Sequence, residues 1–250
     1  AFTGRVLRGA DDNAGPKYMN SPETAVYHKG ELLYGLSKAK QAIKTEKAAI
    51  IVEGNLDVIA SHKAGVKNVV ASSGTALTQD QIRLLSRYTD TLVFSFDKDA
   101  AGFNAALRGI HLATEMGMRV RVLLIPASAG KDPDEVVQKS SELWRTIVAA
   151  PIGIMEYFFE NAAGGKNLAD VEAKREVGHF LVEEIGRLAD PIEREHWLSK
   201  LGDLLRMDVE VLRGSVLTEL LHFQSELAVL LHLLLARLRS RSAGGHVLTA

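Results

Sequence analysis

Between residues 49 and 145, short apolar runs alternate with segments whose apolar residues recur every three or four positions. The expected strands are 49–52, 69–71, 91–96 and 119–125, and the expected helices are 57–64, 78–86 and 100–116. Short apolar runs rich in β-branched and aromatic residues are typical of buried parallel strands. Thr78, followed three residues later by Gln81, predicts a capping box at the start of a helix. The alternation predicts a parallel sheet with helices on its faces.

The flanking segments have different patterns. A short strand over 5–7 and an amphipathic helix over 31–43 are expected before the sheet, and the exposed lysines of that helix (Lys38, Lys40 and Lys44) are interpreted as a solvated face. After residue 147 strand patterns end, and helical patterns broken at 161–166 and 189–191 predict a separate helical domain. The apolar stretch 227–235 is far shorter than the roughly 20 residues that span a bilayer. A disordered tail is expected after residue 236.

Three groups of acidic residues follow expected strands: Glu53 with Asp57, Asp97 with Asp99, and Asp132 with Asp134. If strands 49–52 and 91–96 are neighbours, Glu53, Asp97 and Asp99 meet at the carboxyl edge of the sheet, where open α/β folds bind ligands. Carboxylates crowded there would repel one another unless a divalent cation lay among them. Oxygen ligands without His or Cys favour Mg²⁺ or Mn²⁺ over zinc. For Asp57 and Asp134 taken singly, a purely structural role as a helix cap remains an open alternative.

The composition of the chain restricts its possible partners but does not identify one. The chain has 250 residues, 46% of them hydrophobic, which is enough for one large or two modest domains. A net charge of -1 predicts neither nucleic acid nor membrane as a partner, so any such site must be local. The absence of cysteine excludes a disulfide framework and cysteine-ligated zinc, and it fits a reducing cytosol. The first residues look like the interior of a fold rather than a signal peptide, and we expect a fragment.

Glu-Gly-x-x-Asp after one strand and Asp-x-Asp after a later strand resemble the TOPRIM fold of bacterial primases, topoisomerases, and some nucleases and recombination proteins. Other stretches resemble, in the right order, the RNA polymerase core of bacterial replicative DNA primases: Gly4-Arg5-Val6-Leu7, Pro16 to Thr24, His28-Lys29-Gly30, Leu33-Tyr34-Gly35, Val70 to Thr75 and Asp132-Pro133-Asp134. This resemblance implies an α/β TOPRIM-type parallel sheet flanked by helices, preceded by part of an α+β subdomain and followed by a small helical domain. The expected boundaries are 1–30, 31–148, 149–220 and 221–250.

The same resemblance implies metal-dependent synthesis of short RNA primers on single-stranded DNA from ribonucleoside triphosphates. Its catalytic acids would be Glu53, Asp97 and Asp99, and Asp57, Asp132 and Asp134 would complete a site for Mg²⁺ or Mn²⁺, without zinc in this fragment. Template and nucleotides would contact Arg5, Lys17, Tyr18, Asn20 and Lys29. We expect a cytoplasmic monomer without membrane contact, whose full-length parent binds a replicative helicase. No helicase-binding domain is recognised in the sequence.

Three residues depart from the family pattern: Asn55 replaces an aromatic residue, Ser73 a leucine, and Lys98 the glycine between the paired acids. Two alternatives therefore stay open. The first is another TOPRIM enzyme that cleaves DNA strands, and the second is a non-catalytic DNA-binding module in which the Lys98 ammonium displaces the metal. Strand alternation favours a Lys98 side chain that points away from the acids.

Overall fold

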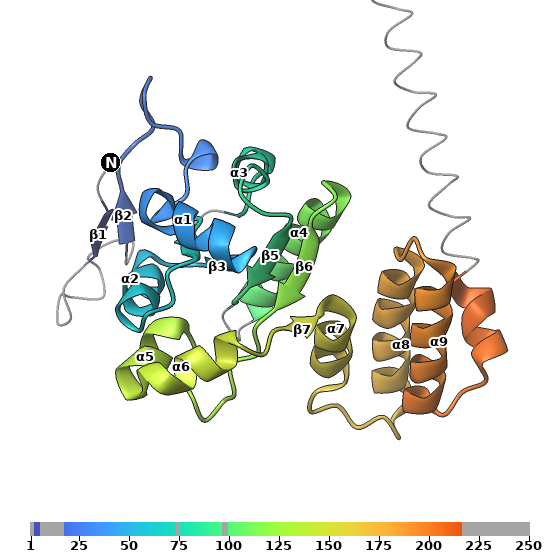
Figure 1. Cartoon of the computed structure of the whole chain (residues 1–250). Coiled ribbons are helices and arrows are strands. Elements are labelled where there is room, and N and C mark those ends of the chain that lie inside the picture. The colour runs from blue at the N-terminus through green and yellow to red at the C-terminus, as the bar shows by residue number, and fades with distance from the viewer. Residues whose placement is uncertain (1–2, 6–17, 74–75, 97–99, 217–250) are drawn as a thin grey trace, which may run out of the picture. The chain divides into compact units, whose positions relative to one another are not determined.

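A five-stranded sheet forms the centre of the first part of the chain (Figure 1). The computed structural model describes residues 3–5, 18–73, 76–96 and 100–216, and it divides into two compact units, Ala1–Ile154 and Met155–Ala250. The strands of the sheet are β3 (Ala49–Val52), β4 (Val69–Ala71), β5 (Thr91–Phe94), β6 (Arg119–Val122) and β7 (Ile152–Gly153), in the spatial order β4-β3-β5-β6-β7. Strand β3 pairs in parallel with both β4 and β5, which confirms that the strands before the two main acid groups are neighbours.

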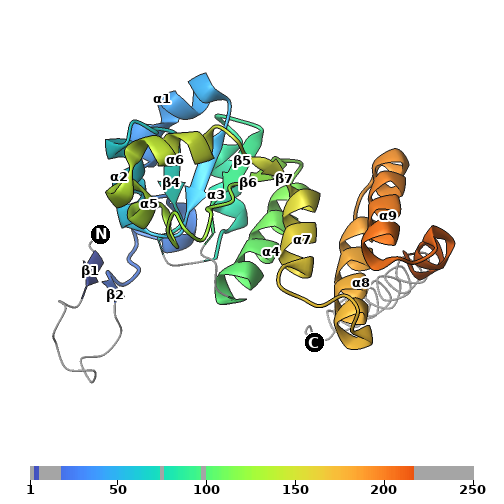
Figure 2. The ribbon, with the colours of Figure 1, turned by 90° about the horizontal axis from the view of Figure 1, so that it is seen from below.

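Helices cover both faces of this sheet (Figures 1 and 2). They are α1 (Leu36–Glu46), α2 (Asn55–Lys63), α3 (Gln79–Leu85), α4 (Ala100–Glu115), α5 (Pro133–Lys139) and α6 (Ser141–Val148). The apolar side chains of α2, α5 and α6 share one buried cluster with Ile50, Val52 and Val93. Because strand side chains alternate, Ile51 and Phe94 point to the opposite face. There Gly109 of α4 lies against the Phe94 ring, and a Cβ at that position would be 3.4 Å from it.

The structure corrects three expected boundaries. The first helix begins at Leu36 rather than Glu31, because Tyr34 forms a β-bridge to Ala71 and Gly35 follows it in the left-handed conformation (φ 82°). Strands β5 and β6 end at Phe94 and Val122, two and three residues earlier than expected. The expectation that no strand follows residue 147 is wrong, since β7 pairs antiparallel with β6 and makes the sheet mixed. Two residues are too few for an alternating pattern, so the sequence could not indicate β7.

Two short strands precede the sheet: β1 (Thr3–Arg5) and β2 (Tyr18–Asn20), which pair antiparallel. Part of the strand expected over 5–7 lies outside the described residues. The short 3₁₀ helix η1 (Lys29–Glu31) follows. The carbonyl of Gly30, within η1, accepts a hydrogen bond from the Thr78 hydroxyl, and Gln81 Nε2 donates to the carbonyls of Lys29 and Leu32. The predicted Thr78/Gln81 capping box is confirmed, and its buried glutamine also fixes the segment before α1.

The second unit is helical. Its elements are α7 (Ile154–Ala163), which begins one residue before the unit, α8 (Val171–Gly186) and α9 (Pro191–Leu205). Aromatic contacts join them: Phe158 meets Phe180 edge to face at 5.6 Å between ring centroids, and Phe159 lies 5.1 Å from Trp197. Gly178 lets α8 approach α9 closely, since a Cβ there would be 3.2 Å from Leu205. Among the helices of the described residues, none combines the length and apolar character of a membrane span.

Candidate active site

Two of the predicted acids, Glu53 and Asp57, lie where β3 turns into α2. Glu53 follows the last residue of β3 and is half-buried. The backbone N–H of Gly54 donates to Asp57 Oδ2 at 3.0 Å, which closes the first turn of α2. A Cβ at Gly54 would lie 2.9 Å from that oxygen, so a residue without a side chain is needed for this approach. The glycine of the Glu-Gly-x-x-Asp pattern is thus explained by the position of the aspartate.

Asp57 also joins the first acid group to the third. Its other oxygen, Oδ1, accepts the backbone N–H of Asp134 at 3.2 Å, across 77 residues of sequence. Only 8% of Asp57 is exposed. Burial is the main cause that raises the pKa of its carboxyl from 3.8 to about 6. The negative charge of Asp132 acts in the same direction, and the two backbone hydrogen bonds oppose the shift. Asp57 therefore acts structurally as a link between the start of α2 and the start of α5.

The third acid group forms the N-terminus of α5. Asp132 is the N-cap, and its Oδ1 accepts the N–H of Glu135 at 2.8 Å. Asp134 Oδ2 accepts a hydrogen bond from Gln138 at 2.8 Å. Pro133 occupies the first position of the helix, as its fixed φ favours. The structure thus brings Asp57, Asp132 and Asp134 together, and each carboxylate has a hydrogen-bonding role there.

The second acid group, Asp97 with Asp99, lies outside the described residues, as does Lys98. The strand that leads to it is described. Phe94 pairs with Ile51, and the Ser95 N–H donates to the Ile51 carbonyl at 2.9 Å, so the parallel register continues past the end of β5. This register places Phe96 level with Glu53, and Asp97 comes next in the chain. Within the described ranges alone, no three His, Cys, Asp or Glu side chains form a group that could hold a metal ion.

The predicted template-side residues are described only in part. Strand pairing sets Arg5 directly opposite Tyr18, and Thr3 opposite Asn20. Lys17 lies outside the described residues. Lys29 begins η1, and its backbone N–H donates to Glu23 Oε1 at 3.1 Å.

Sequence reasoning missed one contact beside the candidate site. The Ser73 hydroxyl donates to Asn55 Oδ1 at 2.7 Å, and Ser73 has φ 61°, which is uncommon for a residue other than glycine. It ties the loop after β4 to the first residue of α2, next to Glu53. Both residues depart from the family pattern, and this paired departure is the sequence feature that could have indicated the contact.

The fold and the acids after adjacent parallel strands define the class of protein. A family model described as Toprim-like matches residues 50–137. A model of the N-terminal domain of the DNA primase catalytic core matches residues 1–40, and one of the DnaB-helicase binding domain of primase matches residues 155–210. The chain therefore contains a Toprim domain flanked by primase-type segments.

Comparison with individual proteins identifies the family. A DNA primase of Clostridium acetobutylicum is 42% identical over 81% of this chain and 33% of its own length. A solved DnaG catalytic core is 31% identical, covers 84% of this chain and 67% of its own, and has a TM-score of 0.62. A DnaG primase catalytic domain solved with single-stranded DNA is 31% identical, covers 83% and 65% of the two chains, and has a TM-score of 0.63.

The chain belongs to the DnaG family of bacterial DNA primases, as the sequence patterns predicted, and its TOPRIM-type fold is confirmed. It spans about a third of the length of the curated relatives that it matches. The expectation that no helicase-binding domain can be recognised is wrong, because such a model matches 155–210. Coverage of 84% by a solved catalytic core also extends beyond the first unit. Helical patterns alone could not distinguish a segment of the core from a helicase-binding segment.

Proposed function

We propose that the chain is part of a bacterial primase that synthesises RNA primers on single-stranded DNA, and that the carboxyl edge of β3 and β5 is its catalytic site. The observation that carries the proposal is the parallel pairing of β3 with β5, which brings Glu53 level with the residue before Asp97. Membership of the DnaG family supports it, and so does the related catalytic domain that binds single-stranded DNA.

The proposed reaction is nucleotidyl transfer. A 3′-hydroxyl oxygen attacks the α-phosphorus of a ribonucleoside triphosphate, a phosphodiester bond forms, and pyrophosphate leaves with the electron pair of the broken P–O bond. The donor set suits hard divalent cations because it consists of carboxylate oxygens. The acids that would hold Mg²⁺ or Mn²⁺ are Glu53, Asp57, Asp97, Asp99, Asp132 and Asp134. When bound, such cations would lower the pKa of the attacking hydroxyl and balance charge on the leaving phosphates.

The protein's own residues would mainly position these groups. The two backbone hydrogen bonds of Asp57 hold the start of α5 against the start of α2, which keeps Asp132 and Asp134 beside the β3 turn. The Asn55–Ser73 hydrogen bond fixes the loop on the other side of that turn. Arg5, Lys17, Tyr18, Asn20 and Lys29 are proposed to contact template and incoming nucleotides. Rigid placement of this kind is the protein's usual contribution to phosphoryl transfer.

The partner and the location are part of the proposal. The match of residues 155–210 to a helicase-binding domain supports binding of a replicative helicase by the second unit in the parent protein. We further propose that the parent works as a cytoplasmic monomer without membrane contact.

The test is Asp97→Ala in the full-length parent, measured as magnesium-dependent dinucleotide synthesis on single-stranded DNA. We expect a loss of about a thousandfold or more, because an acid that neutralises transition-state charge would be removed. Asp90→Ala is the matched control, since Asp90 precedes the same strand β5 and is an exposed acid paired with Arg119. It should keep nearly full activity.

Three outcomes would contradict the proposal. An intact parent that makes no primers would overturn it, and supercoil relaxation or nicking by the parent would favour a strand-cleaving Toprim enzyme. Calorimetry that detects no binding of Mg²⁺ or Mn²⁺ while DNA binding persists would favour the non-catalytic module.

A further inference from the structure

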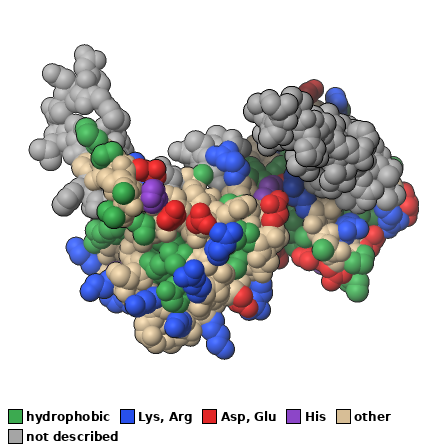
Figure 3. All heavy atoms as spheres, turned by 90° about the horizontal axis from the view of Figure 1, so that it is seen from above, with side chains coloured by type: hydrophobic (Ala, Val, Ile, Leu, Met, Phe, Trp, Pro, Cys, Tyr) green, Lys and Arg blue, Asp and Glu red, His purple; other side chains and the backbone are tan. Residues whose placement is uncertain are grey.

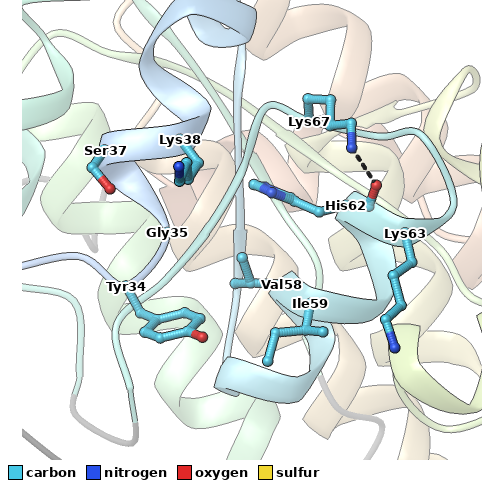
Figure 4. A pocket seen from close by; sticks show the side chains of 9 residues that line it. All are labelled: Tyr34, Gly35, Ser37, Lys38, Val58, Ile59, His62, Lys63 and Lys67. Carbon is cyan, nitrogen blue, oxygen red and sulfur yellow. Dashed lines mark hydrogen bonds between the residues drawn. The ribbon is translucent and has the colours of Figure 1, made fainter.

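A basic cavity lies between the start of α1 and the second half of α2 (Figure 4). Its volume is about 450 Å³. It is lined by Tyr34, Gly35, Ser37, Lys38, Val58, Ile59, His62, Lys63 and Lys67. None of these belongs to the candidate acidic site, and none is acidic, so the cavity is chemically distinct from the sheet edge that carries the acids.

The polar groups of the cavity favour an anion. Lys38 and Lys63 are exposed, and within the described parts of the chain neither ammonium has a hydrogen-bond or ion-pair partner. Lys67 donates one hydrogen bond, to the His62 carbonyl at 2.7 Å, and an ammonium carries three donors. Exposed basic side chains of this unit surround apolar ones on the face drawn in Figure 3. Three lysines around one opening give a local positive potential that the net charge of -1 conceals.

The backbone adds to this preference. Gly35, the N-cap of α1, provides no side-chain cap, and the first turn of α1 contains no acid. Ser37 and Lys38 belong to this turn and line the cavity, so the partial positive charge of the helix N-terminus lies beside it together with the lysines. His62 Nε2 lies 3.1 Å from the Val69 carbonyl, and since that oxygen can only accept, Nε2 carries the proton.

The two ends of the cavity differ in character. In Figure 4 the Tyr34 ring and Ile59 lie at one end of the opening, whereas Lys38 and Lys67 lie at the other. Tyr34 is 40% exposed and Ile59 39%, so both side chains are accessible to a ligand in the cavity. The backbone of Tyr34 is held by two hydrogen bonds to Ala71, so the ring stands on a fixed support. An aromatic ring with an aliphatic side chain forms a stacking surface for a base, and lysines bind phosphate.

We propose that this cavity is a second nucleotide site, which binds a nucleoside 5′-phosphate with its base at Tyr34 and Ile59 and its phosphates at Lys38 and Lys67. The same chemistry is offered by a free nucleoside triphosphate and by one unit of a single strand. A volume of about 450 Å³ suits one nucleotide and falls in the usual range of small-ligand sites. Lys38, interpreted from sequence as part of a solvated face, is thereby assigned to a site.

The test measures binding of ATP and of a 5′-phosphorylated twelve-residue oligothymidylate to the 250-residue chain in EDTA. EDTA removes divalent cations and so prevents metal-dependent phosphate binding at the acids. Failure of these probes to bind is therefore a separate result from failure of the proposed primase activity. Lys38→Gln/Lys67→Gln should weaken binding of the preferred probe by about tenfold or more, because two charge-assisted contacts are lost. Lys40→Gln/Lys47→Gln is the control, since it makes the same charge change at exposed positions that do not line the cavity.

A further pair of variants tests the base end. Tyr34→Ala should weaken ATP binding by about fivefold or more, as expected for a lost stacking contact, and Tyr34→Phe should retain it. Inorganic tripolyphosphate has no base, so its binding should depend on the lysines and be unaffected by Tyr34→Ala.

The outcomes separate the sources and decide the proposal. Tighter binding of ATP than of the oligonucleotide assigns a free nucleotide, and the reverse assigns a strand. For a strand, neutralising two phosphates predicts a slope of about −1.4 in a log-log plot of the binding constant against salt concentration. Equal weakening by the cavity and control variants, or no binding of either probe to the unaltered chain, overturns the proposal.

Discussion

The two ends of helix α2 carry opposite charges, and the charged side chains at one end are hydrogen-bonded more fully than those at the other. At its N-terminus, Asp57 lies beside Asp132 and Asp134, and each of these carboxylates accepts a hydrogen bond. At its C-terminal end, Lys63 and Lys67 lie at a cavity, and only Lys67 has a partner among the described residues. Both arrangements agree in sign with the helix dipole.

Charge alone therefore does not distinguish a structural group from a functional one. Asp57 and Asp132 contribute to the fold because part-buried backbone N–H groups of Gly54, Asp134 and Glu135 donate to them. The lysines at the second end contribute little to the fold, so their charge is available for a ligand. Substitution of the acids should therefore lower the free energy of unfolding. Substitution of the lysines should leave that free energy nearly unchanged and weaken ligand binding instead.

The largest stability effect is expected for Asp57→Ala. Two backbone N–H groups, of Gly54 and Asp134, lose their acceptor, and the loss exceeds the relief from removing a buried charge. We expect a decrease of about 2 kcal/mol in the free energy of unfolding at pH 7, measured by urea denaturation in EDTA. A change below about 0.5 kcal/mol would show that Asp57 does not link α2 to α5.

The same residue should make stability depend on pH. The pKa of Asp57 is raised to about 6 in the folded chain from its ordinary value of 3.8, so the folded state binds the proton more tightly. Its contribution to stability is therefore fully present below pH 3.8 and is lost as the pH rises through 6. The difference between the unaltered chain and Asp57→Ala should grow by about 1 kcal/mol between pH 7 and pH 5. A difference that shrinks on acidification would contradict the assigned shift.

A smaller effect is expected for Asp132→Ala, which removes the N-cap of α5. The loss should be about 1 kcal/mol, the usual effect of removing a capping side chain. Asp132→Asn keeps the acceptor and should restore most of that stability. Thermal denaturation monitored by circular dichroism is sufficient for this comparison, and equal melting temperatures for the two variants would argue against the cap.

The smallest effect is expected for Lys38→Gln/Lys67→Gln. Since Lys38 has no partner in the described structure and Lys67 is exposed, the free energy of unfolding should change by less than about 0.5 kcal/mol. A decrease of more than about 1 kcal/mol would assign these lysines to the fold and weaken the contrast with the acidic end.

Several elements could be predicted because their signals are local. The capping box of Thr78 and Gln81 lies within four residues, and the apolar runs of β3 and β5 each lie within one strand. The strand β7 was missed because its position depends on the exposed edge of β6 rather than on its own pattern. The start of α1 was missed because the bridge from Tyr34 to Ala71 outweighs a helical periodicity that begins at Glu31.

By itself, the sequence determined the family, the alternation of strands and helices that forms the sheet, and the residue types of the candidate site. Each of these follows from patterns that are read along a few residues. Only the tertiary structure decided that Asp57 accepts the N–H of Asp134, and that Lys38 and Lys67 line the same cavity. The reason is physical: these groups are separated along the chain and become neighbours only when burial of the apolar faces of α1 and α2 fixes their helices against the sheet.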